Sequence, residues 1–569
     1  MQHSLLKRVF VIGFIFIFIG MVLIPSLNSN IVKNNRIFNI LDNKKSSSII
    51  DWWPMYQHDT HNTGYSRSIA PSTNYTCWKY SSEGRIVWLS PSVLNGRLYF
   101  GTTYLPYIKT LDVFSILHKI KEISNGIVEG SFICLDAYTG KILWEFPTEW
   151  PILTPTVVDD RVYFNTVDLN ESTEKTIGRI YCLNAETGDK IWNITIDTPP
   201  GQDCWLYSPT VVDGRLYISE PYGKLYCFNA KNGNYIWSVD IGYDENGQCS
   251  VTPAIVDGKV YIKFGQALSW GKIYCFDADN GDELWNYSIG RSEYESPAVI
   301  NGKVFVNGVN WTAMDCTLYC FNSTSGEIIW NTTLYSSDNP IGWSSPAVCN
   351  DSIYLLCFYS LRCFDINSGN LKWSVGISDE SSSSPSIADN KIYFGSHEKD
   401  MMYCRNAENG SLIWSYGLDG NIMSSPAIAD GWIYAATESS IYAFRDNEPP
   451  DSPLIDGPTK CKPGIDYNYT FVTTDPEEDD VWYHLCWGDK EIIYIYGPYP
   501  SGKELKLSYN WTEKGTYTIT CWARDIYDAV SDASTLEVKI PRTRASSYLW
   551  FHWFLDRFPM LERLLNLLR

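Results

Sequence analysis

The sequence predicts an all-β protein, in which an eight-bladed β-propeller is followed by an Ig-like β-sandwich. An apolar signal or anchor helix is expected before these domains and short apolar helices after them. Three observations predict this fold. A tryptophan recurs eight times, with 41 to 48 residues between copies after the first interval. A proline leading into a small apolar run and then Tyr or Phe follows each copy, and a polar turn with glycine precedes seven copies. This period and this density of turns are typical of one four-stranded sheet per repeat.

The repeat is best seen in LYCFNAKNGNYIW, residues 225–237, and in segments such as IYCLNAETGDKIW. Glycine favours the left-handed backbone that such a turn needs. A large rigid tryptophan is suited to wedging between neighbouring blades, with its indole N–H bonded to a turn carbonyl. The repeat tryptophans are Trp78, Trp144, Trp192, Trp237, Trp285, Trp330, Trp373 and Trp414. The turn glycines are Gly140, Gly188, Gly233, Gly281, Gly326, Gly369 and Gly410.

The N-terminus predicts export. Lys7 and Arg8 precede an uncharged apolar run over residues 9–24, as in a secretory signal. Residues 1–27 are therefore predicted to be a cleaved signal peptide or a retained signal anchor, and residues 28–50 a polar linker. The rest of the chain is expected outside the cytoplasm, at the cell surface or secreted and associated with the membrane. The formal net charge of −20 argues against nucleic acid as a partner.

Glycosylation sequons agree with export. The pattern N-x-S/T marks potential attachment sites for glycans. An Asn- and Ser-rich chain also produces the pattern by chance, so occupancy is expected at a few of these sites. They begin at Asn74, Asn170, Asn193, Asn286, Asn310, Asn322, Asn331, Asn350, Asn409, Asn468 and Asn510.

The propeller is predicted over residues 51–447. Each unit holds four strand candidates, and pairs such as Asn95-Gly96 and Asp213-Gly214 are signals of two-residue hairpin turns. An insertion near residues 103–129 contains a possible amphipathic helix, either a decoration of the rim or a partner-binding element. Before the first unit, DWWPMYQHDTHNTGYS holds His58 and His61, three residues apart. No third metal ligand lies nearby in the sequence, so a structural role is expected for them.

Seven of the 16 cysteines occupy one position of the repeat, and they are expected to be buried free thiols. Equivalent positions in successive blades are too far apart for disulfides. Cys204 with Cys249 and Cys349 with Cys357 are weaker disulfide candidates. The seven repeat cysteines are Cys134, Cys182, Cys227, Cys275, Cys320, Cys363 and Cys404.

A proline-rich break, NEPPDSP, ends the propeller and starts a second module over residues 448–541. About seven short strands are predicted there, with Cys486 and Cys521 as a candidate disulfide. Asp475, Glu477, Glu478, Asp479 and Asp480 crowd one loop, which is either a solvated acidic loop or a Ca²⁺ site. Residues 542–569 form an apolar, amphipathic tail that suits a membrane surface or a docking contact.

The Ala-x-x-Gly-x-x-x-Trp segments, such as Ala185 to Trp192, resemble the tryptophan-docking repeat of pyrroloquinoline-quinone-type propellers. That superfamily includes quinoprotein alcohol dehydrogenases and BamB-type assembly propellers. The resemblance covers about residues 51–447 and implies the fold. Dehydrogenases of this family typically have an adjacent cysteine pair near the quinone, and this chain has neither that pair nor a C-x-x-C-H haem motif. The second module, with Trp487 to Asp489 and Gly515 to Asp525, resembles PKD/Ig-like modules of archaeal surface proteins.

Two functions follow as hypotheses. The first is a non-catalytic binding or assembly scaffold without a cofactor, whose partners are other surface or envelope proteins or glycans. The second is an extracellular enzyme, either a quinone-dependent oxidoreductase or a hydrolase, that uses the central funnel. The sequence contains no G-x-S-x-G nucleophile motif, and no catalytic residues are assigned.

Overall fold

The computed structural model divides the chain into two compact units. The first comprises Met1–Ser72 with Trp78–Ala443, and the second comprises Thr73–Cys77 with Phe444–Arg569. The sequence placed this boundary later, after Asn447. The structure describes residues 50–541 with gaps, and residues 556, 557 and 560. The gaps are residues 83–84, 87–89, 105–129, 149–150, 171–174, 197–205, 221–222, 242–247, 250, 267–270, 291–294, 311–314, 336–343, 358, 378–382, 397–398 and 423.

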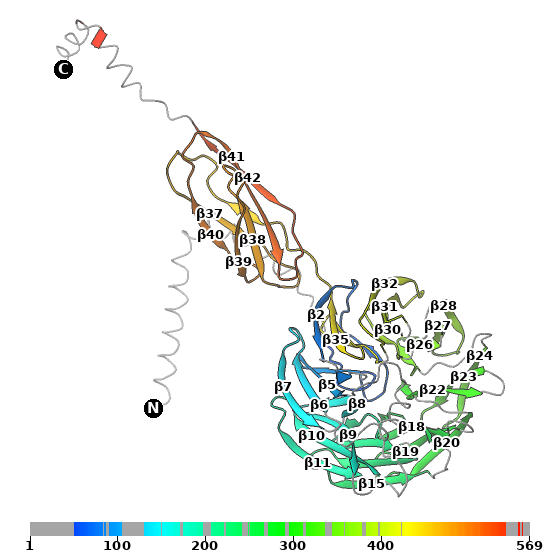
Figure 1. The fold of residues 1–569 in the computed structure, drawn as a ribbon. Coiled ribbons are helices and arrows are strands. Elements are labelled where there is room, and N and C mark those ends of the chain that lie inside the picture. Colours follow the sequence, from blue (N-terminus) through cyan, green and yellow to red (C-terminus); the bar gives the residue numbers. More distant parts are fainter. Residues whose placement is uncertain are drawn as a thin grey trace, which may run out of the picture. The chain divides into compact units, whose positions relative to one another are not determined.

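Eight sheets form the first unit, as Figure 1 shows, and each contains one of the repeat tryptophans. Each sheet is called a blade and is named after its tryptophan. The Trp78 blade consists of β2 (Thr76–Ser81), β35 (Ser440–Arg445), β34 (Trp432–Ala436) and β33 (Ala427–Ala429). The N-terminal strand of this blade, β2, therefore pairs with β35 from the end of the propeller sequence.

The other seven blades are built from consecutive strands, and the Trp414 blade contains in addition β1 (Tyr65–Ser66) from the segment before the first blade. Their bounds are β3 (Arg85–Ile86), β4 (Ser92–Leu94), β5 (Arg97–Tyr104), β6 (Gly130–Asp136), β7 (Ile142–Thr148); β8 (Pro151–Val158), β9 (Arg161–Asn170), β10 (Lys175–Asn184), β11 (Lys190–Ile196); β12 (Thr210–Val212), β13 (Arg215–Glu220), β14 (Lys224–Asn229), β15 (Tyr235–Asp240); β16 (Gln248–Cys249), β17 (Ala254–Val256), β18 (Lys259–Gln266), β19 (Gly271–Asp277), β20 (Glu283–Gly290); β21 (Ala298–Ile300), β22 (Lys303–Asn310), β23 (Asp315–Asn322), β24 (Ile328–Tyr335); β25 (Ala347–Cys349), β26 (Ser352–Cys357), β27 (Ser360–Asp365), β28 (Leu371–Gly376); and β29 (Ser386–Ala388), β30 (Lys391–Gly395), β31 (Met401–Asn406), β32 (Leu412–Gly417).

The inner strands of the eight blades form a closed circuit around the ring axis. In every blade a short three-residue strand or the end of β8 is innermost, and each of these inner strands contacts the inner strands of both neighbouring blades. The circuit runs from β4 through β8, β12, β17, β21, β25 and β29 to β33, which contacts β4 again. The predicted eight-bladed propeller is confirmed. Apolar side chains fill the spaces between blades, as expected for sheets covered on both faces.

The predicted hairpin turns join the inner strand of a blade to the second strand of the same blade. Asn95 and Gly96 between β4 and β5 have φ angles of 52° and 70°. Asp213 and Gly214 between β12 and β13 have φ angles of 50° and 73°. Positive φ at both central residues is the geometry of a type I′ turn, which matches the twist of paired strands.

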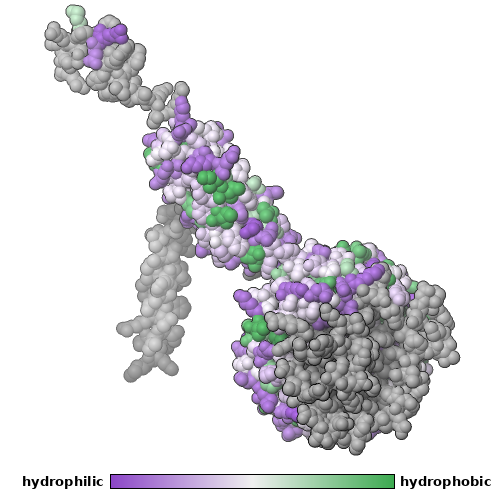
Figure 2. Space-filling view, viewed as in Figure 1, coloured by the Kyte–Doolittle hydropathy of each residue, from purple (hydrophilic) through white to green (hydrophobic). Residues whose placement is uncertain are grey.

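The second unit is a sandwich of two sheets. One contains β36 (Leu454–Asp456), β37 (Tyr467–Val472) and β40 (Leu505–Tyr509); the other contains β39 (Tyr494–Tyr499), β38 (Val481–Cys486), β41 (Gly515–Asp525) and β42 (Ser534–Ile540). Alternate residues face a core that includes Tyr469, Trp487 and Trp511. The face of this unit that Figure 2 shows is polar or intermediate in hydropathy, with a few apolar patches.

Several predictions lie outside the described residues. These are the signal segment 1–27, almost all of the linker 28–50, almost all of the insertion 103–129, and the tail 542–569 except for residues 556, 557 and 560. Within the described part of the chain, no helix is long and apolar enough to cross a membrane.

Candidate functional site

The segment before the first blade, Asp51–Ser68, lies at the centre of the ring and is called the axial segment. Its backbone carbonyls accept hydrogen bonds from six inner-strand N–H groups, one from each of six blades, at 2.7–2.9 Å. Its strand β1 (Tyr65–Ser66) also pairs in parallel with β29. Because the inner strands surround the ring axis, this segment occupies the position where a propeller funnel would otherwise be open. The six donors are Val93, Val157, Ile255, Val299, Val348 and Ile387.

Buried amide side chains attach the axial segment to further inner residues. Asn62 Nδ2 donates to the carbonyls of Thr252 and Pro297, at 3.3 and 3.2 Å, and so bridges two blades. Gln57 Nε2 donates to Ser425 Oγ at 3.2 Å. Gln57, His58 and Asn62 have φ angles of 50°, 76° and 55°. These unusual backbone angles allow successive carbonyls to face different blades.

Serine hydroxyls connect neighbouring blades around the axis. These serines precede the inner strands of their blades, and their hydroxyls link one blade to the next. A backbone N–H in one blade donates to a serine Oγ in the next, at 2.8–3.2 Å. The series runs from Ser296 to Ser345, Ser384, Ser425 and Ser90. These serines are therefore structural in the described geometry.

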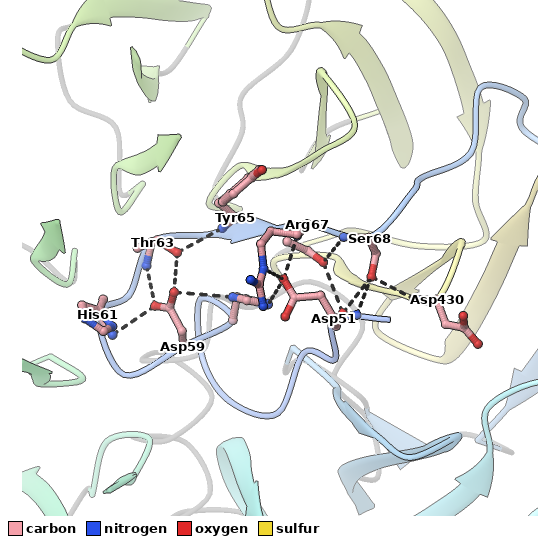
Figure 3. Close-up of polar contacts among 10 residues, drawn as sticks. Asp51, Asp59, His61, Thr63, Tyr65, Arg67, Ser68 and Asp430 are labelled. Atoms are coloured by element: carbon pink, nitrogen blue, oxygen red, sulfur yellow. Dashed lines mark hydrogen bonds and ion pairs between the residues drawn. The ribbon is translucent and has the colours of Figure 1, made fainter. Parts of the chain in front are cut away.

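A buried histidine organises the polar contacts of the axial segment. His58 is 8% exposed and lies between two carboxylates, with Nε2 3.4 Å from Asp51 Oδ2 and Nδ1 3.5 Å from Asp59 Oδ2. Asp59 also accepts the N–H groups of His61 and Thr63, both at 3.0 Å. Asp51 accepts the Arg67 N–H at 2.7 Å, and Figure 3 draws the contacts of Asp51 and Asp59 with Arg67, His61 and Thr63 as dashed lines.

The charges of this cluster shift its pKa values. Burial alone would lower the pKa of His58, but hydrogen bonding to Asp51 and Asp59 and their negative charges raise it to about 9. Burial would raise the pKa of both aspartates, yet contact with His58 holds each pKa below its usual value. His58 is therefore protonated at neutral pH. Among the described residues, His58 and His61 do not belong to any group of metal-ligating side chains.

The repeat tryptophans and turn glycines form the predicted contacts between neighbouring blades. The ring of each of seven tryptophans lies against the turn glycine of the next blade, so that a Cβ on Gly281 would come within 2.8 Å of Trp237. The seven glycines have φ angles of 68° to 79°. Trp237 Nε1 donates to the Ala278 carbonyl at 3.1 Å, and five other tryptophans make the equivalent bond. Trp237, Trp285 and Trp414 are buried, whereas the other five are partly exposed at the edge of the ring.

The seven repeat cysteines are buried and free, as predicted. The proposed disulfide between Cys486 and Cys521 is wrong, because both thiols are free. In the β38–β41 pair, Cys486 is opposite Thr520 and Cys521 is opposite Leu485, so the two thiols are one residue out of register and face opposite sides of the sheet. Cys349 and Cys357 are also free. Cys204 lies outside the described residues.

Three acidic side chains converge in the second unit. One carboxylate oxygen from each of Asp475, Glu477 and Asp479 lies within 4.8 Å of the other two, whereas Glu478 and Asp480 are exposed and outside this group. Asp475 is 4% exposed; its Oδ1 accepts two backbone N–H groups, and its Oδ2 is buried with no partner among the described residues. Burial raises the pKa of Glu477 to about 7 and that of Asp479 to about 6. These oxygens are the described atoms best suited to hold a cation.

A pyrroloquinoline quinone does not fit the described residues on the ring axis. This quinone is a flat tricarboxylate and requires free cationic side chains and open space. The axial segment takes that space. The buried cationic side chains among the described residues of the ring are His58 and Lys263, and both already have acidic partners. Lys263 Nζ lies 2.8 Å from Glu295 Oε2.

The fold and the centre of the ring define the class of this protein, a propeller of the pyrroloquinoline-quinone-like type followed by a two-sheet β-sandwich. Residues 68–332 and 358–448 match the family model described as "Outer membrane protein assembly factor BamB". The chain belongs to this family. None of the curated proteins compared is a match.

Two solved structures share the fold of the propeller. The quinohemoprotein alcohol dehydrogenase from Comamonas testosteroni is 13% identical, with a TM-score of 0.51, and the match covers 69% of this chain and 80% of that one. A quinohemoprotein alcohol dehydrogenase from Pseudomonas putida HK5 is 12% identical, with a TM-score of 0.51 and coverage of 70% and 83%. The PKD domain of an M14-like peptidase from Thermoplasmatales archaeon SCGC AB-540-F20 is 45% identical over 17% of this chain and 100% of its own, with a TM-score of 0.17.

The axial segment is the feature that the sequence did not predict. Its signal was present, because a stretch rich in Asn, Gln, Asp and His precedes the first repeat. The carbonyls that join it to the blades carry no sequence signature.

Proposed function

We propose that this protein is an exported, non-catalytic scaffold that binds other proteins of the cell envelope. The observation that carries this proposal is the axial segment, which bonds the centre of the ring to its own chain. With the axis used in this way, the rims and outer edges of the propeller remain for binding. Loops and edges on a rigid framework are well suited to that role.

Family membership supports the proposal, since the family is described as an assembly factor for outer membrane proteins. Exposed apolar residues on edge strands also support it. Tyr235 on β15 is 61% exposed, and Ile495 on β39 of the second unit is 59% exposed. Unpaired strand edges with apolar side chains are places where other chains can add a strand or a side chain.

Photo-crosslinking in intact cells tests the proposal. A photoreactive amino acid is placed at Tyr235 or at Ile495 of the full-length protein, and the fully buried Trp53 position is the control. We expect a small number of discrete crosslinked products with envelope proteins at one or both exposed positions, and no products at Trp53. Absence of products at both exposed positions would count against a scaffold that binds through these edges.

A quinone titration tests the enzymatic alternative. Purified protein is mixed with pyrroloquinoline quinone and Ca²⁺, and uptake is followed by absorbance and by reduction of a dye in the presence of alcohols. We expect no stoichiometric uptake and no turnover, because the axial segment occupies the centre of the ring. Uptake of one quinone per chain with turnover would overturn the non-catalytic proposal.

Membrane association is proposed through the N-terminal segment, the C-terminal tail or both. Deletion of residues 548–569 is expected to release protein into the medium if the N-terminal segment is cleaved. Undiminished association with cells, together with a demonstrated cleavage, would show that the tail is not an anchor.

The second unit carries a separate proposed activity, binding of Ca²⁺ at Asp475, Glu477 and Asp479. Two observations support it. The three carboxylates converge, and the buried Oδ2 of Asp475 has no partner among the described residues. The buried carboxylate of Asp525 adds negative charge near the group, and the single positive charge of Arg445, 3.2 Å from Asp479, does not balance it. Hard oxygen ligands suit Ca²⁺, and water or backbone carbonyls can complete the coordination that three carboxylates begin.

Calorimetric titration of the full chain with CaCl₂ tests this site. We expect one Ca²⁺ per chain, at least tenfold weaker binding for Asp475→Asn, and unchanged binding for Asp480→Asn, which alters an exposed neighbour outside the group. Equal effects of the two substitutions, or no binding at millimolar Ca²⁺, would exclude the site.

A further inference from the structure

The residue that follows the repeat tryptophan lies on the outermost strand of its blade. In three blades this residue is asparagine: Asn193 on β11, Asn286 on β20 and Asn331 on β24. Each of these strands is the last in its sheet and pairs on one side only. The three asparagines occupy the same place in the repeat, opposite Tyr181, Tyr274 and Tyr319 of the neighbouring strand.

The residue two positions later varies together with this asparagine. In the three asparagine blades it is Thr195, Ser288 or Thr333, which completes the N-x-S/T pattern each time. The other five blades have Lys, Glu or Ser after the tryptophan, and a hydroxyl residue occurs at the later position in one of them. The later residues of those five blades are Ser81, Pro147, Asp240, Gly376 and Gly417.

Strand geometry presents both residues of the pattern together. Positions two apart in a strand lie on the same face, so the asparagine and its hydroxyl partner are side by side. Asn286 and Ser288 are both exposed, Asn331 and Thr195 are exposed, and Asn193 and Thr333 are half-buried. The amide of Asn286 donates to Glu283, another exposed side chain on the same strand, so this contact can be exchanged with solvent.

The sequon at Asn322 has a different environment. Its Oδ1 accepts the backbone N–H groups of Thr324 and Ser325, both at 2.9 Å, and so caps the turn between β23 and β24. The side chain of Asn322 therefore serves the fold. It provides an internal comparison for the three strand asparagines, for which no such turn contact is described.

We propose that Asn193, Asn286 and Asn331 are N-glycosylated, and that these glycans cover the outer edge of one part of the propeller. The amide Nδ2 of each asparagine attacks the anomeric carbon of an oligosaccharide linked to a polyisoprenyl phosphate or diphosphate. The bond from this carbon to the phosphate oxygen breaks, the carbon–Nδ2 bond forms, and one amide proton is released to water as the lipid phosphate leaves. This assignment rests on the export that is part of the proposed function.

The glycans would protect a vulnerable surface. An outermost strand presents unpaired N–H and C=O groups that can pair with another chain. The same strands expose Ile191, Leu284 and Ile329, which are 42%, 46% and 45% exposed. A bulky polar glycan beside these residues blocks edge-to-edge association. In Figure 1 the strands β11, β20 and β24 belong to blades away from the one that contains β2.

Glycopeptide mass spectrometry of the protein from its own cells tests the proposal. We expect glycan on the peptides that contain Asn193, Asn286 and Asn331, and unmodified Asn322. In a second pair of variants, Ser288→Ala should abolish the glycan at Asn286, whereas Ser288→Thr keeps the pattern and should retain it. Both substitutions leave Asn286 in place, so a difference between them reports the sequon and not the fold.

Unmodified peptides at the three positions would overturn the proposal, as would glycan on Asn322 in their place. Labelling of intact cells with an impermeant amine reagent separates the two ways in which it can fail. If the protein is unmodified but is labelled outside the cell, the proposed glycans are excluded and the proposed export is retained. Unmodified protein that is protected from the label rejects both.

Discussion

His58 holds a positive charge inside the ring because two aspartates surround it. The first prediction concerns pH. The pKa of His58 is raised from about 6.5 to about 9, so its stabilising contribution is complete below about pH 6.5 and is lost as the pH rises through about 9. The pKa values of Asp51 and Asp59 are lowered, so their contributions are present above about pH 4 and are lost at lower pH.

We therefore expect the wild-type propeller to lose stability between pH 6.5 and 9.5 more steeply than His58→Gln, as measured by urea unfolding at each pH. His61→Gln is the matched control, since this histidine does not form the two ion pairs. Parallel pH profiles for wild type and His58→Gln would contradict the assignment of the charge.

Alanine substitutions at two turn glycines distinguish the cost of a left-handed backbone from the cost of steric overlap with a tryptophan. Gly258 and Gly281 have φ angles of 70° and 79°, but a Cβ on Gly258 meets nothing within 4 Å, whereas one on Gly281 meets Trp237. We expect Gly258→Ala to destabilise the propeller by about 1–2 kcal/mol, the cost of the left-handed conformation. Gly281→Ala should cost at least about 1 kcal/mol more, because the tryptophan must move. Urea unfolding of both variants measures the difference, and equal losses would show that the tryptophan moves freely.

At the scale of elements, the axial segment connects blades that are distant in sequence. Asn62→Gly removes the amide that bridges two blades but tolerates the φ angle of 55°. Leaving two buried carbonyls without a donor should cost about 2–3 kcal/mol in the free energy of unfolding. Asn301→Gly is the control, because this exposed hairpin residue has a φ angle of 51°. A loss for Asn301→Gly as large as that for Asn62→Gly would rule out the bridging role.

The repeat made the blades predictable and left the axial segment unpredicted. Trp237, Gly281 and Cys227 belong to a pattern that occurs several times in phase, and each copy strengthens the assignment of the others. Asn62 and His58 occur once, and their partners are backbone carbonyls and distant aspartates that no spacing links. The Cys486–Cys521 disulfide was wrong for a related reason, because a register shift of one residue reverses the side of the sheet and is invisible without the pairing.

At the scale of the whole molecule, the two units have separate cores. Trp511 is 1% exposed in the core of the second unit, and Trp237 is 7% exposed between two blades of the first. We expect Trp511→Ala and Trp237→Ala each to cost about 3–5 kcal/mol in the unit that contains the tryptophan. Calorimetric unfolding should show that each variant lowers one transition and leaves the other in place. A common shift of all transitions by either variant would show that the units unfold together.

The pairing of β2 with β35 has a consequence for biosynthesis. Roughly 360 residues separate these two strands, and synthesis at about 5–20 residues per second takes about 18–72 s over that distance. Throughout that interval β2 has no partner strand, and the ring cannot close. A chain that is secreted while still unfolded would not close the ring inside the cell, because β35 crosses the membrane only after the rest of the propeller sequence. The position of β2 in the sequence thus means that the propeller can close only after β35 has been synthesised.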